Sequence, residues 1–120
     1  MNHTCEKIII SCIDFRFQKE VSRFAQSMDE NEENDRVSIA GAVRDVEFLL
    51  KQIEISKRLH KIKEVCLLIH EDCGAYAQEG EYRQKQDMDK VEKEIRSRWP
   101  KMKVKKYWMI LSGGWKEIIN

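Results

Sequence analysis

The sequence predicts an α/β fold in which a mostly parallel sheet of four to five strands, in the order 2-1-3-4, carries helices on both faces. Short apolar runs rich in β-branched residues alternate along the chain with longer segments whose apolar residues recur at helical spacing. This alternation favours a parallel sheet, because each helix returns the chain to the same end of the sheet. The length of 120 residues suits a single domain over 1–120, and no linker or internal repeat interrupts it.

The first half of the chain is predicted to form two strands and two helices. In chain order these are a strand over 7–12, a helix over 18–28, a solvated acidic loop over 29–35, a strand over 36–40 and a helix over 44–60. The first strand rests on three consecutive isoleucines, which are typical of a strand buried on both faces. The second helix closes with basic residues, which are favourable at a helix C-terminus.

The second half is predicted to add one clear strand, one helix and two further strands. In chain order these are a strand over 64–70, an irregular segment over 76–83, a helix that includes 88–99 and ends at Pro100, a strand over 103–111 and a short strand over 115–119. The strand over 64–70 is the best defined, because it is continuous, apolar and of typical strand length. Gly80 is expected to break the irregular segment, and Pro100 cannot continue a helix.

Charge and composition argue against several classes of partner. The 22 basic and 21 acidic residues nearly cancel and are interspersed, so no basic surface for nucleic acid is expected. No apolar run is long enough to span a bilayer, and the polar segment over 1–7 does not resemble a signal peptide. The expected location is the cytoplasm, where cysteines stay reduced and act as core residues, metal ligands or reactive thiols.

Two clusters of reactive side chains follow predicted strands. Cys12, Asp14 and Arg16 close the first strand, and His70 and Cys73 close the third. In open α/β sheets, ligands bind beyond the carboxyl ends of the strands where the strand order reverses, and the predicted order places both clusters there. Two thiols and one imidazole match a zinc site that leaves one position open. A redox disulfide between Cys12 and Cys73 is the competing interpretation.

The spacing around these residues suggests a role for each. His70 and Cys73 are three apart, so one turn can bring both to a metal, and a helix that begins at Cys73 would favour its thiolate. Gly74 would let the backbone pass close to the site. Asp14 could be a fourth ligand or accept a hydrogen bond from bound water. Arg16 could hold the Asp14 carboxylate in a bidentate pair and draw it off the metal.

The pattern C-x-D-x-R followed by H-x-x-C-G resembles the β-class carbonic anhydrases, of which this chain would be a short, minimal member. The segment over 35–41 resembles a weak form of the family's R-N-A-G strand end, with Ser38 and Ile39 in place of Arg and Asn. The resemblance implies that Cys12, His70 and Cys73 bind Zn²⁺. It also implies that Asp14 and Arg16 are catalytic, and that two glycines lie at the substrate, namely Gly41 and Gly74.

The activity implied by this resemblance is that of a zinc lyase that reversibly hydrates CO₂ to bicarbonate by attack of zinc-bound hydroxide. One alternative is a non-catalytic zinc-binding domain in which Asp14 closes the metal site. Another is a hydrolase of a related small molecule such as COS or CS₂. The resemblance further implies a small-molecule substrate and a homodimer or higher homo-oligomer.

The remaining candidate residues have ordinary structural interpretations. Cys66 lies inside the third predicted strand and is expected to be a small core residue. Cys5 has no predicted partner, and His60 is expected to be exposed at a helix end. Tyr76 is expected to pack in the interior.

Overall fold

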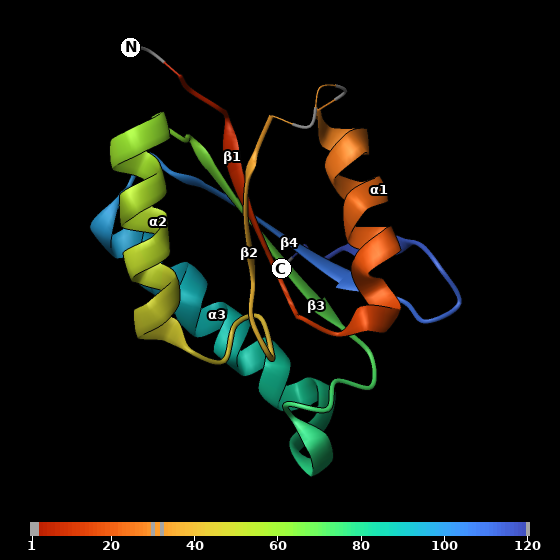
Figure 1. The fold of residues 1–120 in the computed structure, drawn as a ribbon. Coiled ribbons are helices and arrows are strands. Elements are labelled where there is room, and N and C mark those ends of the chain that lie inside the picture. The colour runs from red at the N-terminus through yellow and green to blue at the C-terminus, as the bar shows by residue number, and fades with distance from the viewer. Residues whose placement is uncertain (1–2, 30, 32, 120) are drawn as a thin grey trace.

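A central sheet flanked by helices organises the chain (Figure 1). The computed structural model describes residues 3–29, 31 and 33–119. Its strands are β1 (Lys7–Ser11), β2 (Asp35–Ser38), β3 (Glu64–His70), β4 (Lys103–Met109) and β5 (Trp115–Glu117). Its helices are η1 (Phe15–Phe17), α1 (Gln18–Met28), α2 (Val46–His60), η2 (Ala77–Glu79) and α3 (Gly80–Arg98).

The strand order is β2-β1-β3-β4-β5, which confirms the predicted order. The first four strands are parallel to their neighbours, whereas β5 runs antiparallel to β4. The connection between β4 and β5 is a short turn, and so short a connection can join only antiparallel strands. β5 therefore forms one edge of the sheet, and β2 forms the other.

Helices cover both faces of the sheet, as predicted. α2 and α3 lie on one face and α1 lies on the other (Figure 1). Because successive strand residues point to opposite faces, Ile8 and Ile10 join the core under α2 and α3, whereas Ile9 joins the core under α1. Cys66 is fully buried in the α1 core, which agrees with its predicted role as a core residue.

The irregular segment predicted over 76–83 is the main error in the sequence-based assignment. η2 lies there, and α3 begins at Gly80, well before the first apolar residue of its pattern. The first turns of α3 are polar, so they carry no apolar periodicity. They are nevertheless anchored, because Gln84 donates a hydrogen bond to the His70 carbonyl and Asp87 accepts one from Tyr76.

Several predicted boundaries also shift. α1 and β3 match their predicted ranges, whereas each of the other strands, including the one predicted over 36–40, differs at one or both ends. α2 begins at Val46 because the Asp45 side chain accepts a hydrogen bond from the Phe48 amide and caps the helix. Asp35, which is predicted to lie in the acidic loop, is instead the first residue of β2. Glu30 and Glu32 of the predicted acidic loop, and Met1 and Asn2, lie outside the described residues.

Within the described part of the chain, no helix combines the length and the apolar character that crossing a membrane requires.

Candidate metal centre

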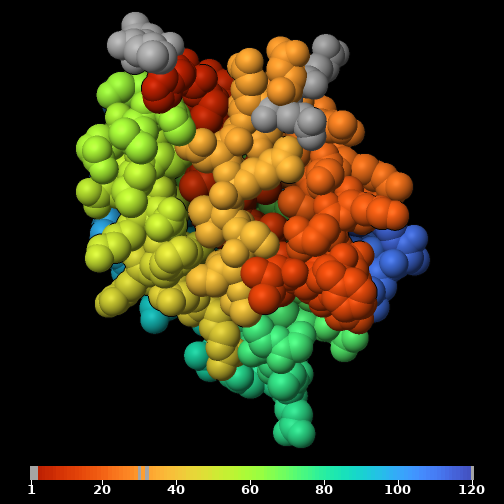
Figure 2. All heavy atoms as spheres, viewed as in Figure 1, coloured from red at the N-terminus to blue at the C-terminus, as the bar shows by residue number. Residues whose placement is uncertain are grey.

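The carboxyl ends of β1 and β3 bring three potential metal ligands together. These strands are neighbours; Cys12 follows β1, His70 ends β3, and Cys73 lies in the next turn. The two Sγ atoms and a ring nitrogen of His70 all lie within 4.8 Å of one another, and all three residues are buried. Figure 2 shows the orange-red atoms that follow β1 resting on the green atoms that follow β3 at this end of the sheet.

The separation of the two sulfurs suits a shared metal ion. Sγ of Cys12 and Sγ of Cys73 are 3.9 Å apart, and both cysteines are free. Two thiolates on one tetrahedral zinc, each at about 2.3 Å, would lie about 3.8 Å apart. A disulfide requires the sulfurs to be only about 2.05 Å apart. The separation therefore suits joint metal binding, and no disulfide joins the two cysteines in this structure.

The imidazole of His70 is oriented so that one nitrogen is available. Nδ1 lies 2.7 Å from the Glu71 carbonyl oxygen, which can only accept, so Nδ1 carries the proton. Nε2 is buried and has no hydrogen-bond partner among the described residues. The ring also packs against Phe17, with ring centroids 4.2 Å apart. A fixed tautomer with an unpartnered Nε2 lone pair is the usual state of a metal-binding histidine.

The three ligands differ in their electrostatic surroundings. Burial raises the pKa of the Cys12 thiol, but the His70 ring and the Gly41 amide outweigh burial and lower this pKa to about 7. Burial and the neighbouring Cys12 raise the pKa of Cys73. Burial lowers the pKa of His70, but Cys12 and the Glu71 carbonyl raise this pKa by more than burial lowers it, so the net shift is upward.

Asp14 and Arg16 form a bidentate pair at the edge of this cluster. Nε of Arg16 lies 3.1 Å from each carboxylate oxygen of Asp14, and Nη2 lies 2.7 Å from Oδ2. The Arg16 amide also donates to Oδ1, so Asp14 caps η1. Hydrogen bonding to Arg16 lowers the pKa of Asp14 to about 2. Oδ2 is 3.9 Å from Nε2 of His70, which places the carboxylate beside the ligand set.

Asp72 is a further member of the site whose contact the sequence did not reveal. Nη1 of Arg16 lies 3.0 Å from Asp72 Oδ2, and Nη2 lies 2.8 Å from the Asp72 carbonyl oxygen. Asp72 has a positive φ of 54°, a conformation that Asp tolerates better than most residues. Its position between His70 and Cys73 could have signalled proximity, but nothing local identified Arg16 as its partner.

Two glutamines also support the site from outside it. Gln18 donates from Nε2 to the carbonyls of Cys12 and Asp14, at 3.0 and 2.8 Å, and so fixes the turn that carries both residues. Gln84 is buried and donates to the His70 carbonyl at 3.0 Å. The Gln18 contacts are local, whereas the Gln84 contact has no sequence signature because it depends on how α3 packs against the end of β3.

The expected roles of the turn residues change in part. Cys73 does not begin a helix, as the spacing had suggested, because η2 starts only at Ala77. Gly41 has a φ of 82°, and its amide donates to Sγ of Cys12 at 3.3 Å. A Cβ at Gly74 would meet nothing within 4 Å, so the described atoms do not require glycine there.

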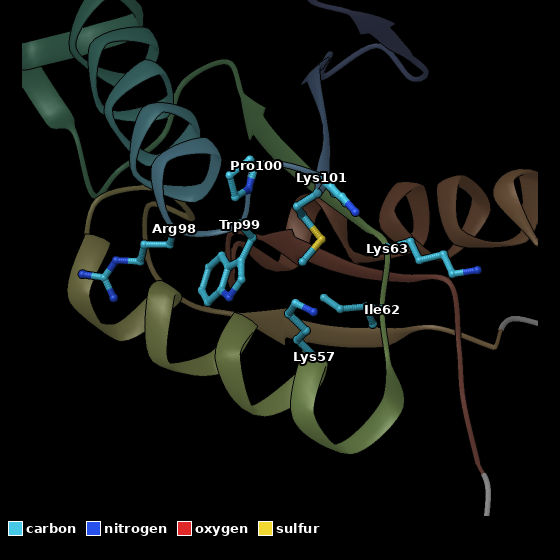
Figure 3. A pocket seen from close by; sticks show the side chains of 8 residues that line it. Lys57, Ile62, Lys63, Arg98, Trp99, Pro100 and Lys101 are labelled. Atoms are coloured by element: carbon cyan, nitrogen blue, oxygen red, sulfur yellow. The ribbon is translucent and has the colours of Figure 1, made fainter.

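A pocket elsewhere on the protein is separate from this centre. It lies where α2 and α3 end, lined by Trp99 and Ile62 and bordered by the basic residues Lys57, Arg98 and Lys101 (Figure 3). None of its lining residues belongs to the Cys12–His70–Cys73 cluster. It therefore contributes nothing to the candidate centre.

Comparison of the sequence identifies one family and two relatives. The family model described as "Putative carbonic anhydrase" matches residues 2–118. An uncharacterised protein of Rickettsia bellii (strain RML369-C) is 29% identical over 126 residues, which cover 88% of this chain and 77% of that protein. An uncharacterised protein of Rickettsia conorii (strain ATCC VR-613 / Malish 7) is 33% identical over 78 residues, which cover 58% of this chain and 42% of that protein.

Solved structures share the fold at low sequence identity. Carbonic anhydrase from Streptococcus mutans has a TM-score of 0.67 at 16% identity, covering 98% of this chain and 84% of its own. Carbonic anhydrase from Glaciozyma antarctica has a TM-score of 0.65 at 17% identity, covering 99% and 85%. Tetrameric β-carbonic anhydrase from Sordaria macrospora has a TM-score of 0.62 at 14% identity, covering 98% and 82%. Since the family match spans almost the whole chain, the protein belongs to this carbonic anhydrase family and has the β-carbonic anhydrase fold.

Proposed function

We propose that this chain is a zinc-dependent lyase that reversibly hydrates CO₂ to bicarbonate at the Cys12–His70–Cys73 centre. The observation that carries the proposal is the position of Asp14, which Arg16 holds beside three zinc-type ligand atoms. Such an arrangement places a proton acceptor next to a metal position that the carboxylate itself does not fill. Membership of the carbonic anhydrase family supports the same reaction.

Zinc fits the residues present. Two thiolates and one imidazole nitrogen are ligands that zinc prefers, and the 3.9 Å sulfur separation suits tetrahedral coordination. The unpartnered Nε2 of His70 would gain a partner on metal binding, which removes the cost of burying it alone. Bound zinc would supply Lewis acidity that lowers the pKa of a water molecule toward neutrality.

The side chains around the centre would position the reactants. Asp14 would accept a hydrogen bond from the nucleophile and orient it, while the bidentate pair with Arg16 keeps the carboxylate ionised and in place. Asp72 holds the other side of the Arg16 guanidinium and so fixes the pair. The Gly41 amide would stabilise negative charge on Cys12. We propose both Gly41 and Gly74 as substrate contacts.

A second candidate function is a non-catalytic zinc-binding domain. The observation that favours it is the 3.9 Å distance between Asp14 Oδ2 and Nε2 of His70, which is short enough for a rotated Asp14 to reach the same metal. In that state Asp14 would be the fourth ligand and no position would remain for water.

An open centre of this chemistry could also hydrolyse a related linear substrate such as COS or CS₂.

We also propose a homodimer or higher homo-oligomer in the cytoplasm. Ile13 and Phe15 flank Asp14 and leave 57% and 85% of their surface exposed. Exposed apolar side chains next to a site are typical of an interface that another subunit covers.

The decisive experiment measures zinc content and CO₂ hydration on the same purified sample across pH. The open centre predicts bound zinc and hydration that is lost in Cys73→Ser and strongly reduced in Asp14→Asn. Arg23→Gln, which changes an exposed arginine on α1, serves as the matched control and should hydrate CO₂ normally. If Cys73→Ser loses a zinc that the unmodified chain holds, but the unmodified chain neither hydrates CO₂ nor hydrolyses COS or CS₂, the closed centre is favoured. If Cys73→Ser loses no zinc, both functions are refuted.

A further inference from the structure

A second group of metal-ligating side chains lies at the opposite end of the sheet. Cys5 precedes β1, Asp35 opens β2, and His60 ends α2. One ligand atom from each lies within 4.8 Å of the other two. Figure 1 shows the start of β1, the start of β2 and the end of α2 together at the end of the sheet remote from the loop that follows β3. The group is therefore separate from the Cys12–His70–Cys73 centre.

The structure holds the members of this group in place. Nδ1 of His60 lies 3.0 and 2.7 Å from the two carboxylate oxygens of Asp35. The Ser56 hydroxyl donates to Asp35 Oδ2, which fixes the carboxylate from the other side. The backbone amide of Cys5 donates to the His60 carbonyl at 3.0 Å, so the cysteine is tied to the end of α2. Side-chain partners that orient ligands in this way are a regular feature of metal sites.

A fourth potential ligand lies on the same segment as Cys5. The ring of His3 meets the ring of His60 edge-on, with centroids 5.2 Å apart. His3 is exposed, and only one residue separates it from Cys5. To join the group as a second imidazole, this side chain would have to rotate toward Cys5 and Asp35.

An ion pair alone does not account for the arrangement. A histidine at the C-terminus of α2 that pairs with Asp35 is explained by the helix dipole and the carboxylate. Neither of these requires a thiol, and within the described part of the chain the Cys5 thiol donates only a long contact, to the Lys7 carbonyl at 3.7 Å. The Asp35 and His60 side chains remain 28% and 29% exposed, so an ion could enter from solvent.

We propose that Cys5, Asp35 and His60, with His3 as the fourth ligand, form a second zinc site. Thiolate, carboxylate and imidazole are all zinc ligands, and one thiolate with one carboxylate would neutralise the ion. Binding would release the Cys5 thiol proton, and coordination through Nδ1 of His60 would place that ring's proton on Nε2. A nitrogen and an oxygen bound to one tetrahedral zinc lie about 3.3 Å apart, so Nδ1 of His60 and the Asp35 carboxylate, now 2.7 Å apart at the shorter contact, would separate by about 0.6 Å. The ion would tie the segment before β1 to β2 and α2.

The test is zinc stoichiometry of the full-length chain after loading with Zn²⁺ and dialysis. Cys5→Ser should bind one zinc fewer per chain than the unmodified protein. His60→Asn should lose the same zinc, although an asparagine amide can still donate to Asp35 and preserve the local fold. Cys66→Ala is the matched control and should lose none, because this thiol is buried in the core under α1 and belongs to neither ligand group.

The same substitutions in a Cys12→Ser/Cys73→Ser background separate the two sites. There the unmodified second group should still bind one zinc, and Cys5→Ser should abolish it. Cobalt loading adds an independent readout, since a Cys5 thiolate ligand gives a charge-transfer band that Cys5→Ser removes. If Cys5→Ser and His60→Asn bind as much zinc as the unmodified chain, the second site does not exist, whatever the first site does. If the double-serine background does not fold, the comparison in the otherwise unmodified chain still decides.

Discussion

Arg16 holds the Asp14 carboxylate with Nε and Nη2 at 3.1 and 2.7 Å, while Asp14 Oδ2 lies 3.9 Å from Nε2 of His70. Asp14 and Arg16 are only two positions apart, and the tight turn after β1 brings their side chains together. Arg16 thereby fixes the carboxylate that lies beside the Cys12–His70–Cys73 cluster. The same guanidinium contacts Asp72, which links this pair to the loop that follows β3.

Replacing Arg16 with lysine should separate metal binding from activity. A lysine ammonium cannot form the bidentate pair, so Asp14 becomes free to approach the metal. We expect Arg16→Lys to retain zinc but to lose about 10²-fold or more of its CO₂ hydration rate. Zinc analysis and stopped-flow hydration check this. Arg23→Lys on α1 is the control, and unchanged hydration in Arg16→Lys would show that the pair is only structural.

Gly41→Ala should destabilise the protein and disturb Cys12. Gly41 has a φ of 82°, and an added Cβ would lie 3.1 Å from Arg44 Cβ and 3.3 Å from Ala75 Cβ. Backbone strain of this kind costs about 1–3 kcal/mol, and crowding adds to it. Gly113→Ala separates the two effects, because Gly113 also has a positive φ but its Cβ would meet nothing within 4 Å. Denaturant unfolding should show the larger loss for Gly41→Ala; equal losses would mean that crowding has no effect.

Tyr76→Phe should lower the free energy of unfolding by about 1–3 kcal/mol. The Tyr76 hydroxyl donates to Asp87 Oδ2 at 2.7 Å, and both residues are buried. Without the hydroxyl, the buried carboxylate loses one of its partners. Tyr82→Phe, at an exposed position on the same helix as Asp87, should change stability little. Thermal unfolding of the two variants in parallel tests this, and a stable Tyr76→Phe would mean that water or Arg83 replaces the bond.

Stability should decline at alkaline pH, in part because of Cys66. Burial and the nearby Glu64 carboxylate raise the pKa of this thiol from 9.0 to about 12. The folded state therefore keeps a proton that the unfolded state releases. Stability from the neutral thiol is complete below pH 9.0 and is lost progressively between 9.0 and about 12.

Urea unfolding across this pH range measures the effect. Cys66→Ala should show a shallower alkaline decline in stability than the unmodified protein. Part of the decline that remains should come from Tyr107, whose pKa burial raises to about 12. Cys5→Ser, which removes a less buried thiol, is the control. An identical decline in Cys66→Ala and the unmodified chain would contradict the buried-thiol account.

The sequence by itself determined where the buried strands and the two motif blocks lie, and it predicted the strand order that the structure confirms. The apolar run over 64–70 and the isoleucines of β1 indicate buried parallel strands, because strands covered on both faces are apolar on both faces. Once these strands are neighbours, Cys12 and His70 must meet at the same end of the sheet. Local pattern was sufficient there, since residues close to a strand end inherit their position from the strand.

Tertiary structure alone decided the contacts between distant segments. The polar start of α3 carries no apolar periodicity. It is fixed instead by the hydrogen bond that the Gln84 side chain donates to the His70 carbonyl. Arg16 contacts Asp72 only because the loop that follows β1 and the loop that follows β3 meet beyond the sheet. Cys5 and His60, which had no predicted partners, meet through Asp35 because the amino ends of β1 and β2 pack against the end of α2. A hydrogen bond between segments depends on how helices pack on the sheet, and packing is a property of the whole chain rather than of any local spacing.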